Sequence, residues 1–401
     1  MLSVMEVISV VNANPKGETI VSGQVTLNRD NAAKLIINQQ SKKAIINWQD
    51  FSIGRSEEIK IIQPSTNSVV LNRVISNQVS NILGTLTANG KVFLINPNGV
   101  VFGNGSKVDV SALITSTHDI KDNNFLSDTL SFTISGDRDA KIINEGTISV
   151  AEGGLVALVA PSLKNAGIIY ARLGRVALAA GNAVTIDPYG DDLISFEVDE
   201  KTANQLISAN KNSLAGLIDL SGSIIAEGGG VLITVDQARN AVDNAINMTG
   251  YIQAKSLHKS AGKIILDGGK GDINLEGIIQ ASGTAGSDGG EIRVLTDGNL
   301  KTTDSMKILA TGDQSGDGGF VAVSSWAQQE IANQVSVRGG AESENNGWLY
   351  VGENIKAART FKNPNDEGAG KVGAGSKTVY FEKNIGQTEG SVKYLTRGEG
   401  Q

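Results

Sequence analysis

Short runs in which apolar and polar residues alternate recur along most of the chain, and glycine, asparagine or aspartate residues separate them. Lys263–Leu266, Asp272–Leu275 and Ile278–Ala281 are three successive runs of this kind. Alternation with a period of two, interrupted at short intervals by turn residues, is typical of β-strands and not of helices. The pattern therefore predicts an all-β fold.

The runs also repeat at a fixed spacing. A similar apolar strand opens at Gly262, Gly290, Gly319 and Gly347. These openings are separated by 28, 29 and 28 residues. Earlier in the chain, Leu155–Ala160 matches Arg175–Ala180 at an offset of 20 residues. A repeat of about 20 to 50 residues is the signature of a solenoid, and three short strands per repeat predict a parallel β-helix. We expect the strand openings of successive repeats to stack at a step of about 5 Å.

A single coil of this kind does not fold alone, because the backbone entropy lost on ordering it exceeds what its few buried aliphatic side chains return. The open backbone of the first coil therefore needs a cover. Residues 1–60, with alternating runs at Thr19–Leu27 and Ala44–Trp48, are predicted to form this N-terminal cap.

Some segments depart from the strand pattern. Asp199–Ala209 and Val235–Ala245 have helical spacing and are predicted to be short helices on excursions from the stack. Repeats of about 28 residues continue over 241–360. The period fades after Phe361, so we expect 361–401 to be irregular.

The composition excludes several kinds of site. The chain contains 48 Gly and no Cys, its net charge is −7, and charged residues make up 19% of it. The absence of Cys excludes disulfides, thiol catalysis and Cys-based zinc sites, and it suits a chain that crosses an oxidising compartment unfolded. The negative charge argues against a phosphate-binding surface, so we expect no nucleic-acid partner. The apolar start, Met1–Val11, carries Glu6 and no basic region, so it is not a complete signal peptide.

The sequence offers few groups of residues that could form a catalytic site. Parallel β-helices include enzymes that cleave polysaccharides, and glycoside hydrolysis requires two carboxylates. The candidates for such a pair are Asp187, Asp191, Asp192, Asp288 and Asp317. Solvated turn residues are the favoured explanation for them, and the two histidines, His118 and His258, support no metal cluster or catalytic triad. We expect no enzymatic activity, no metal and no cofactor; a carbohydrate-binding or polysaccharide-cleaving surface protein is the alternative.

A strand–turn–strand motif over Leu86–Gly103 is the sharpest local signal. Pro97 fixes φ at the second turn position, Asn98 and Gly99 tolerate positive φ, and the Asn96 side chain can bond the backbone of the turn. A tight β-corner is therefore predicted here.

Arg73 lies within a run with an apolar strand pattern, Val70–Val74. A charged side chain in such a strand needs a partner if it is buried. We expect a structural ion pair at Arg73 in preference to ligand binding.

Four upstream segments accompany the turn motif: Ile46–Ile53, Gln63–Ser65, Val70–Val74 and Ile82–Gly84. Together with the turn, they resemble the haemagglutination-activity, or two-partner-secretion, domain at the N-terminus of filamentous-haemagglutinin-like exoproteins. The resemblance covers about residues 15–240, where Gly174–Val184 and Leu193–Val198 are also similar. It implies a right-handed parallel β-helix, in agreement with the repeats.

The resemblance further implies a secretion signal. Domains of this family are recognised by the periplasmic modules of a dedicated outer-membrane β-barrel transporter. The exoprotein crosses the periplasm unfolded and then folds at the bacterial cell surface, or is secreted. By this resemblance the secretion motif consists of Asn96, Pro97, Asn98 and Gly99. These residues either contact the transporter or hold the fold.

An unfolded chain also offers extended strands that a module can bind by strand addition. The segment Ile59–Val74 is the expected strand donor, and its candidate recognition residues are Gln63, Pro64, Asn72 and Arg73. Some family members carry a second motif, Asn-Pro-Asn-Leu, which this chain lacks. Adhesion, through host-cell or cell-surface receptors, is the expected role, while toxin delivery and haemolysis remain compatible with the resemblance.

Overall fold

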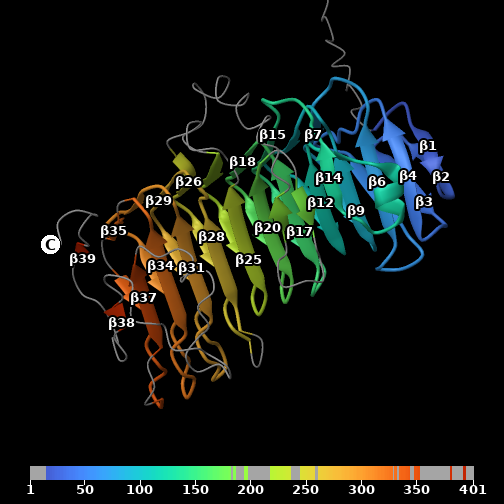
Figure 1. Cartoon of the computed structure of the whole chain (residues 1–401). Helices are drawn as coiled ribbons and strands as arrows, with labels where there is room; N and C mark the ends of the chain where they lie inside the picture. The colour runs from blue at the N-terminus through green and yellow to red at the C-terminus, as the bar shows by residue number, and fades with distance from the viewer. Residues whose placement is uncertain are drawn as a thin grey trace, which may run out of the picture.

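Three parallel sheets form the walls of one solenoid in the computed structural model (Figure 1). The structure describes residues 15–181, 184–186, 194–196, 217–235, 244–257, 261–327, 329–331, 334–343, 347–352, 380–381 and 392–393. Within them, each coil passes through the three walls in turn and hydrogen-bonds to the coils before and after it. The predicted right-handed parallel β-helix is confirmed.

The first wall has thirteen strands. They are β1 (Thr19–Ser22), β4 (Lys43–Trp48), β6 (Val69–Val74), β9 (Lys91–Ile95), β12 (Ala112–Ser116), β17 (Leu155–Ala160), β20 (Arg175–Ala180), β25 (Gly230–Val235), β28 (Lys263–Asp267), β31 (Glu291–Thr296), β34 (Phe320–Ser325), β37 (Trp348–Gly352) and β38 (Tyr380–Phe381).

The second wall has twelve strands. They are β2 (Val25–Asn31), β3 (Lys34–Gln39), β5 (Glu58–Ile62), β8 (Thr85–Ala88), β11 (Lys107–Val110), β16 (Thr147–Val150), β19 (Ile168–Tyr170), β24 (Ser223–Ile225), β27 (Tyr251–Gln253), β30 (Ile278–Gln280), β33 (Lys307–Leu309) and β36 (Gln334–Ser336).

The third wall has ten strands and begins later in the sequence than the other two walls. They are β7 (Ser80–Ile82), β10 (Val100–Phe102), β15 (Lys141–Asn144), β18 (Ser162–Asn165), β23 (Ile218–Leu220), β26 (Asn244–Met248), β29 (Asp272–Leu275), β32 (Leu300–Thr302), β35 (Gln329–Ile331) and β39 (Val392–Lys393).

The predicted repeats appear as neighbouring strands in register. Lys263 pairs with Glu291, which pairs with Phe320. Leu155–Ala160 pairs with Arg175–Ala180, residue for residue, at the predicted offset. The corner glycines also stack, since a Cβ built on Gly290 would lie 2.1 Å from the carbonyl oxygen of Gly262. The sequence period is therefore the period of the coil.

Antiparallel strands cover the N-terminal end of the stack. β1 runs antiparallel to β4 and β2 antiparallel to β3, whereas β3 and β4 already pair in parallel with β5 and β6. The proposed cap over 1–60 thus contains both the antiparallel cover and the first parallel coil. β2 carries Asn28, Arg29 and Asp30 on its exposed part, and charged residues discourage a free strand edge from pairing with other chains.

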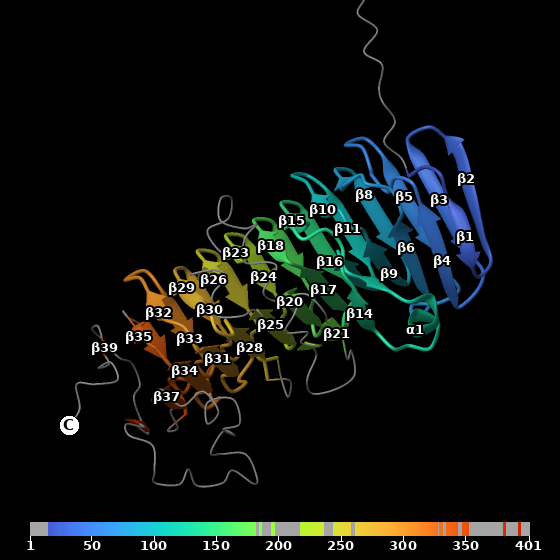
Figure 2. The same ribbon diagram turned by 45° about the horizontal axis from the view of Figure 1, so that its top comes forward.

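An excursion from the coils covers part of the outer face of the first wall (Figure 2). It contains α1 (Asp122–Leu126) and a small antiparallel sheet of β13 (Asp119–Ile120), β14 (Ser131–Ile134), β21 (Val184–Ile186) and β22 (Ile194–Phe196). Phe125 and Phe132 pack there against outward-facing residues of the wall such as Leu71 and Phe93. A second apolar core therefore lies outside the solenoid, beside the aliphatic core that runs through its interior.

The two predicted helices, at Asp199–Ala209 and Val235–Ala245, are described by the structure only in part. Asp199–Ala209 lies outside the described residues, as does 236–243. At its two ends the prediction for Val235–Ala245 is wrong, because Val235 closes β25 and Ala245 lies in β26, where both are buried in the interior core. In the described parts of 361–401, β38 and β39 pair antiparallel with β37 and β35. No helix within the described ranges has the length and apolar character needed to span a bilayer.

Candidate functional site

The turn at Asn96–Gly99 joins β9 of the first wall to β10 of the third. The Gly99 N–H donates to the Asn96 carbonyl at 3.0 Å, and the Asn98 N–H donates to Asn96 Oδ1 at 2.9 Å. Asn98 has a negative φ, so only Gly99, at φ +117°, uses the left-handed region. The predicted corner is present, with Asn98 in a type I position.

The two asparagines of the turn also hold a neighbouring loop. Asn96 is fully buried, and its Nδ2 donates to the Gln78 carbonyl and to Ser80 Oγ, both at 2.9 Å. Asn98 Nδ2 donates to the Ser76 carbonyl at 2.8 Å. On the other side, the Pro97 carbonyl accepts the Asp137 N–H at 2.8 Å. The turn therefore ties together three segments that are distant in the sequence.

Gln63 lies at a different corner, after β5 in the second wall. Its side chain is 4% exposed, and its Nε2 donates to Gln39 Oε1 at 3.0 Å. The Asn89 amide bonds both backbone groups of Gln63, at 2.7 and 2.8 Å. Pro64, the next residue, is exposed. In the folded protein Gln63 holds the corner and only Pro64 is available to a partner.

Asn72 and Arg73 point to opposite faces of β6, as neighbours in a strand must. Asn72 faces the interior and is fully buried, and its Oδ1 accepts the Trp48 indole N–H at 3.0 Å. The Trp48 ring packs edge-to-face on Phe51 at 5.5 Å between ring centroids. Asn72 thus satisfies a buried indole, which is a structural task.

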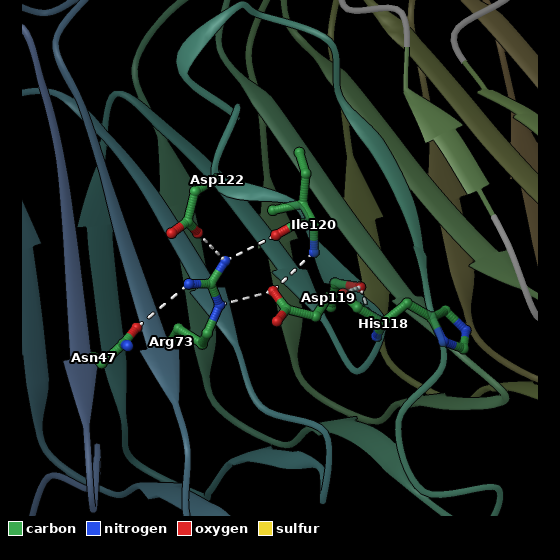
Figure 3. A network of polar contacts seen from close by, with 7 residues as sticks. Asn47, Arg73, His118, Asp119, Ile120 and Asp122 are labelled. Atoms are coloured by element: carbon green, nitrogen blue, oxygen red, sulfur yellow. Dashed lines mark hydrogen bonds and ion pairs between the residues drawn. The ribbon is translucent and has the colours of Figure 1, made fainter. Parts of the chain in front are cut away.

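Arg73 points outward into the excursion (Figure 3). Its Nε donates to Asp119 Oδ1 at 2.9 Å, and its Nη2 lies 2.7 Å from Asp122 Oδ1 and 2.8 Å from the Ile120 carbonyl. Burial alone would lower the pKa of Arg73, but the two carboxylates outweigh it and the pKa is raised. The expected structural ion pair is confirmed.

A second cation also fastens the excursion, and the sequence analysis did not single it out. Lys43 Nζ donates to the carbonyls of Phe125 and Leu126, at 3.0 and 2.7 Å, and lies 2.8 Å from Asp128 Oδ1. These carbonyls end α1, where a positive charge is favourable. The only signal in the sequence was a lysine at the start of an apolar strand, which is too common to be informative.

The excursion consists of two chain segments, 119–134 and 184–196, and His118 links the points at which they leave the coils. It is 2% exposed, and its Nε2 lies 2.7 Å from the Gly181 carbonyl, so Nε2 carries the proton. Among the described residues, Nδ1 has no hydrogen-bond partner. Burial lowers the pKa of His118, and the Gly181 bond offsets this only in part. The neutral imidazole is therefore the form that fits this position.

The side chains of Asp288 and Asp317, two of the candidate catalytic carboxylates, form hydrogen bonds between neighbouring coils. Asp288 Oδ1 accepts the Asp317 N–H at 2.7 Å, and Asp317 Oδ1 accepts the Ser343 hydroxyl at 2.7 Å. Both carboxylates thus connect successive corners. Asp187, Asp191, Asp192 and His258 lie outside the described residues. Within the part of the chain that the structure describes, no three His, Cys, Asp or Glu side chains gather as metal ligands would.

The eight recognition candidates do not form one site. Arg73 pairs with Ile95, the residue before Asn96, so Arg73 and the turn are neighbours. Gln63 and Pro64 occupy the corner at the other end of the same coil. Asn72, Asn96 and Gln63 hold neighbouring coils together, whereas Arg73 fastens the excursion and Pro64 is exposed.

Comparison with known proteins decides the family. Residues 11–281 match the family model of the TPS secretion domain, which covers more than half of the chain. The chain belongs to the TPS secretion domain family. The match extends beyond the expected 15–240 at both ends.

Individual relatives agree with this assignment. A heme/hemopexin-binding protein of Haemophilus influenzae is 29% identical over 299 residues, 72% of this chain and 32% of the relative. One from another strain, KW20 / Rd, is 31% identical over 214 residues, 52% and 23% of the two chains. The crystal structure of the HMW1 secretion domain from Haemophilus influenzae is 25% identical with a TM-score of 0.64, and the alignment covers 82% of this chain and 91% of that domain.

The family membership has direct consequences. The chain carries the secretion domain of a two-partner secreted exoprotein, and the family implies a partner transporter in the outer membrane and a secreted or surface-exposed protein. The chain spans about a third or less of the length of the curated relatives it matches.

Proposed function

We propose that this TPS secretion domain directs the export of its exoprotein through the partner β-barrel. The family match over residues 11–281 is the observation that carries the proposal. The turn at Asn96–Gly99 supports it, because buried amides and a positive-φ glycine fix one conformation there. Its residues and those of the Gln63 corner serve export by making the coils close in one register.

We also propose that the chain crosses the periplasm unfolded and presents Ile59–Val74 to periplasmic modules of the transporter. In the folded protein β5 and β6 are paired on both sides, so their backbone groups are unavailable for strand addition. Strand recognition therefore belongs to the unfolded chain. Folding at the cell surface then withdraws these strands from the transporter.

After export the protein serves adhesion in this proposal, through host-cell or cell-surface receptors, and has no enzymatic activity. Both candidate carboxylates at Asp288 and Asp317 bond the next corner of the stack, which weighs against a polysaccharide-cleaving pair. A second candidate role is binding of heme or hemopexin, because two heme/hemopexin-binding proteins share 29% and 31% identity with this chain.

The test is export in a host that lacks other such systems. The chain is expressed with a secretion signal, with and without the outer-membrane barrel encoded next to it, and its amount is measured in the medium, at the cell surface and in the periplasm. We expect export only with the barrel. Equal export without it would overturn the proposal, and cleavage of polysaccharides by the purified protein would favour the enzymatic alternative.

A further inference from the structure

Three asparagine–glycine pairs lie in the described part of the chain, at 89–90, 98–99 and 104–105. The asparagine of a fourth pair, at 346–347, lies outside the described residues. In such a pair the backbone nitrogen of the glycine can close a five-membered ring onto the side-chain carbonyl carbon of the asparagine, and glycine has no Cβ to hinder the approach. Ring closure requires that the side chain and the nitrogen are both free to move.

The fold restrains two of these pairs. The Asn89 side-chain amide accepts the Gln63 N–H at 2.7 Å and donates to the Gln63 carbonyl at 2.8 Å. Asn98 Nδ2 donates to the Ser76 carbonyl at 2.8 Å. The Gly99 N–H, the group that would attack, already donates within the turn at 3.0 Å. Local opening must break these hydrogen bonds before either ring can close.

The pair at 104–105, in the turn between β10 and β11, differs from the other two. Asn104 and Gly105 are exposed, and among the described residues neither the Asn104 side chain nor the Gly105 N–H makes a hydrogen bond. A Cβ built on Gly105 would have nothing within 4 Å, whereas one on Gly99 would lie 2.8 Å from the Lys141 carbonyl oxygen. A ring between Asn104 and Gly105 therefore has room to form.

A guanidinium group lies against the amide that would react. Arg55 Nη1 donates to the Asn104 carbonyl oxygen at 3.2 Å. This oxygen belongs to the same amide as the Gly105 nitrogen, so resonance spreads a negative charge on that nitrogen to the oxygen. A cationic donor at the oxygen stabilises the charge. Arg55 thereby favours the deprotonated nitrogen that attacks.

We propose that Asn104 is a site of spontaneous deamidation and isomerisation in the folded protein, with water as the co-reactant. The Gly105 nitrogen loses its proton and bonds to Asn104 Cγ, while the bond from Cγ to Nδ2 breaks and Nδ2 leaves as ammonia. Water then opens the succinimide ring. Attack at Cγ gives aspartate, and attack at the main-chain carbonyl gives isoaspartate, so that one water is consumed for each ammonia released.

Both products change the corner chemically. Each places a carboxylate next to Arg55 in place of a neutral amide, and isoaspartate also adds one methylene to the main chain. Asn104 and Gly105 lie outside the strands, and the Ser106 N–H closes the turn on the Gly103 carbonyl at 3.0 Å. We therefore expect the modification to alter this turn and to leave the coils paired.

The experiment incubates the full 401-residue chain in heavy-oxygen water and analyses tryptic peptides by mass spectrometry. The label enters only during incubation, so deamidation during digestion is not counted. Cleavage after Lys91 and Lys107 leaves Asn98 and Asn104 on one peptide, where fragment ions compare them directly. We expect Asn98 to deamidate at least about tenfold more slowly than Asn104, since a hydrogen bond that must break first contributes about a factor of ten.

The same chain unfolded in guanidinium chloride separates the effect of the fold from that of the sequence. There Asn98 and Asn104 should deamidate at similar rates, because neither side chain is restrained. Equal rates in the folded protein, or the same ratio in the folded and the unfolded chain, would overturn the proposal. Aspartate without isoaspartate would show direct hydrolysis of the amide and would overturn the succinimide step.

The role of Arg55 has its own variant. Arg55→Met removes the donor at the Asn104 carbonyl and should slow deamidation of Asn104 severalfold. Arg29→Met, which removes another exposed arginine, on β2, is the matched control and should leave the rate unchanged. Both variants should keep the circular dichroism spectrum of wild type. An unchanged rate in Arg55→Met would overturn the assistance assigned to the guanidinium.

Discussion

At the scale of single residues, the corners determine which positions tolerate change. Gly99 has φ +117°, and a Cβ there would lie 2.8 Å from the Lys141 carbonyl oxygen. Gly105 has φ +86° but nothing within 4 Å of its would-be Cβ. The two glycines share the strained backbone conformation, and only the first has the close neighbour.

This difference predicts unequal costs for the same substitution. Gly105→Ala should lower the free energy of unfolding by about 1 kcal/mol, the cost of a left-handed alanine. Gly99→Ala should lower it by about 3 kcal/mol, because the clash with the next coil adds to that strain. Urea unfolding of both variants measures the costs. Equal losses of unfolding free energy would show that the coil containing Lys141 shifts to accommodate the added Cβ without cost.

The residue scale also shows the reach of sequence reasoning. The turn, the need for glycine at Gly99 and the ion pair of Arg73 could be predicted, because each follows from local chemistry. The partners of Arg73 could not, since Asp119 lies 46 residues away and nothing in the sequence distinguishes it from other aspartates. Sequence reasoning could not identify these partners because they are far from Arg73 along the chain, not because the contact is weak.

At the scale of elements, the excursion is attached to the first wall by an apolar core and by two cations of the wall, Arg73 and Lys43. Arg73 is 11% exposed and contacts two carboxylates and a carbonyl. Arg172, paired with Glu152 at 3.3 Å, is 42% exposed and serves as a comparison on the coil surface.

Removing each arginine should therefore have different effects. Arg73→Met should cost about 3 kcal/mol of unfolding free energy, because it leaves Asp119 partly buried without its cation. Arg172→Met should cost less than about 1 kcal/mol, as exposed ion pairs do. Chemical denaturation followed by circular dichroism compares them. A small loss for Arg73→Met would mean that the excursion is held by its apolar contacts alone.

The link that His118 makes between the two segments of the excursion should respond to pH. The folded-state pKa of His118 lies below the ordinary 6.5, so the unfolded chain takes up a proton more readily than the folded one. The contribution of neutral His118 to stability is thus complete above about pH 6.5 and is lost as the pH falls from there toward the folded-state pKa.

His118→Gln provides the matched variant, since its amide can still donate to the Gly181 carbonyl but does not titrate. We expect wild type to lose stability relative to this variant between pH 7 and pH 5 in urea unfolding series. A constant difference between the two proteins over that range would contradict the role assigned to His118.

The helices and strands differ in how well they could be predicted from the sequence. The strands at 263–281 were predicted almost to the residue, because a repeating coil gives the same pattern several times. The excursion was not predicted, since its short strands and the five-residue α1 do not repeat. Val235 and Ala245, the two ends of one predicted helix, misled because apolar residues at helical spacing also fit the ends of two strands that face one core.

At the scale of the whole molecule, the stack behaves as a row of nearly equivalent units in which each coil contacts only its neighbours. Glu291 pairs with Lys263 before it and with Phe320 after it. The same inward and outward alternation continues across these coils. A coil is therefore removable if the cut falls at equivalent corners.

Deletion of residues 290–318, one full coil, should join Lys263 to Phe320 in register and leave a folded protein. We expect one cooperative unfolding transition at a lower denaturant concentration than in wild type, because fewer neighbour contacts remain. Deletion of 290–303, about half a coil, should disrupt the register and cause aggregation. Equal behaviour of both deletions would show that the coils are not interchangeable units.

The excursion has a consequence for the timing of folding. Residues of the segment 119–134 contact residues that lie 46 to 83 positions earlier in the chain, at Arg73 and Lys43. The early coils can stack from contacts between near neighbours, but their outer wall stays uncovered until this later segment has arrived. Contacts between distant parts of a chain form slowly. A chain emerging N-terminus first should thus pass through a stage in which Leu71 and Phe93 face water, and the arrival of Phe125 and Phe132 ends that stage.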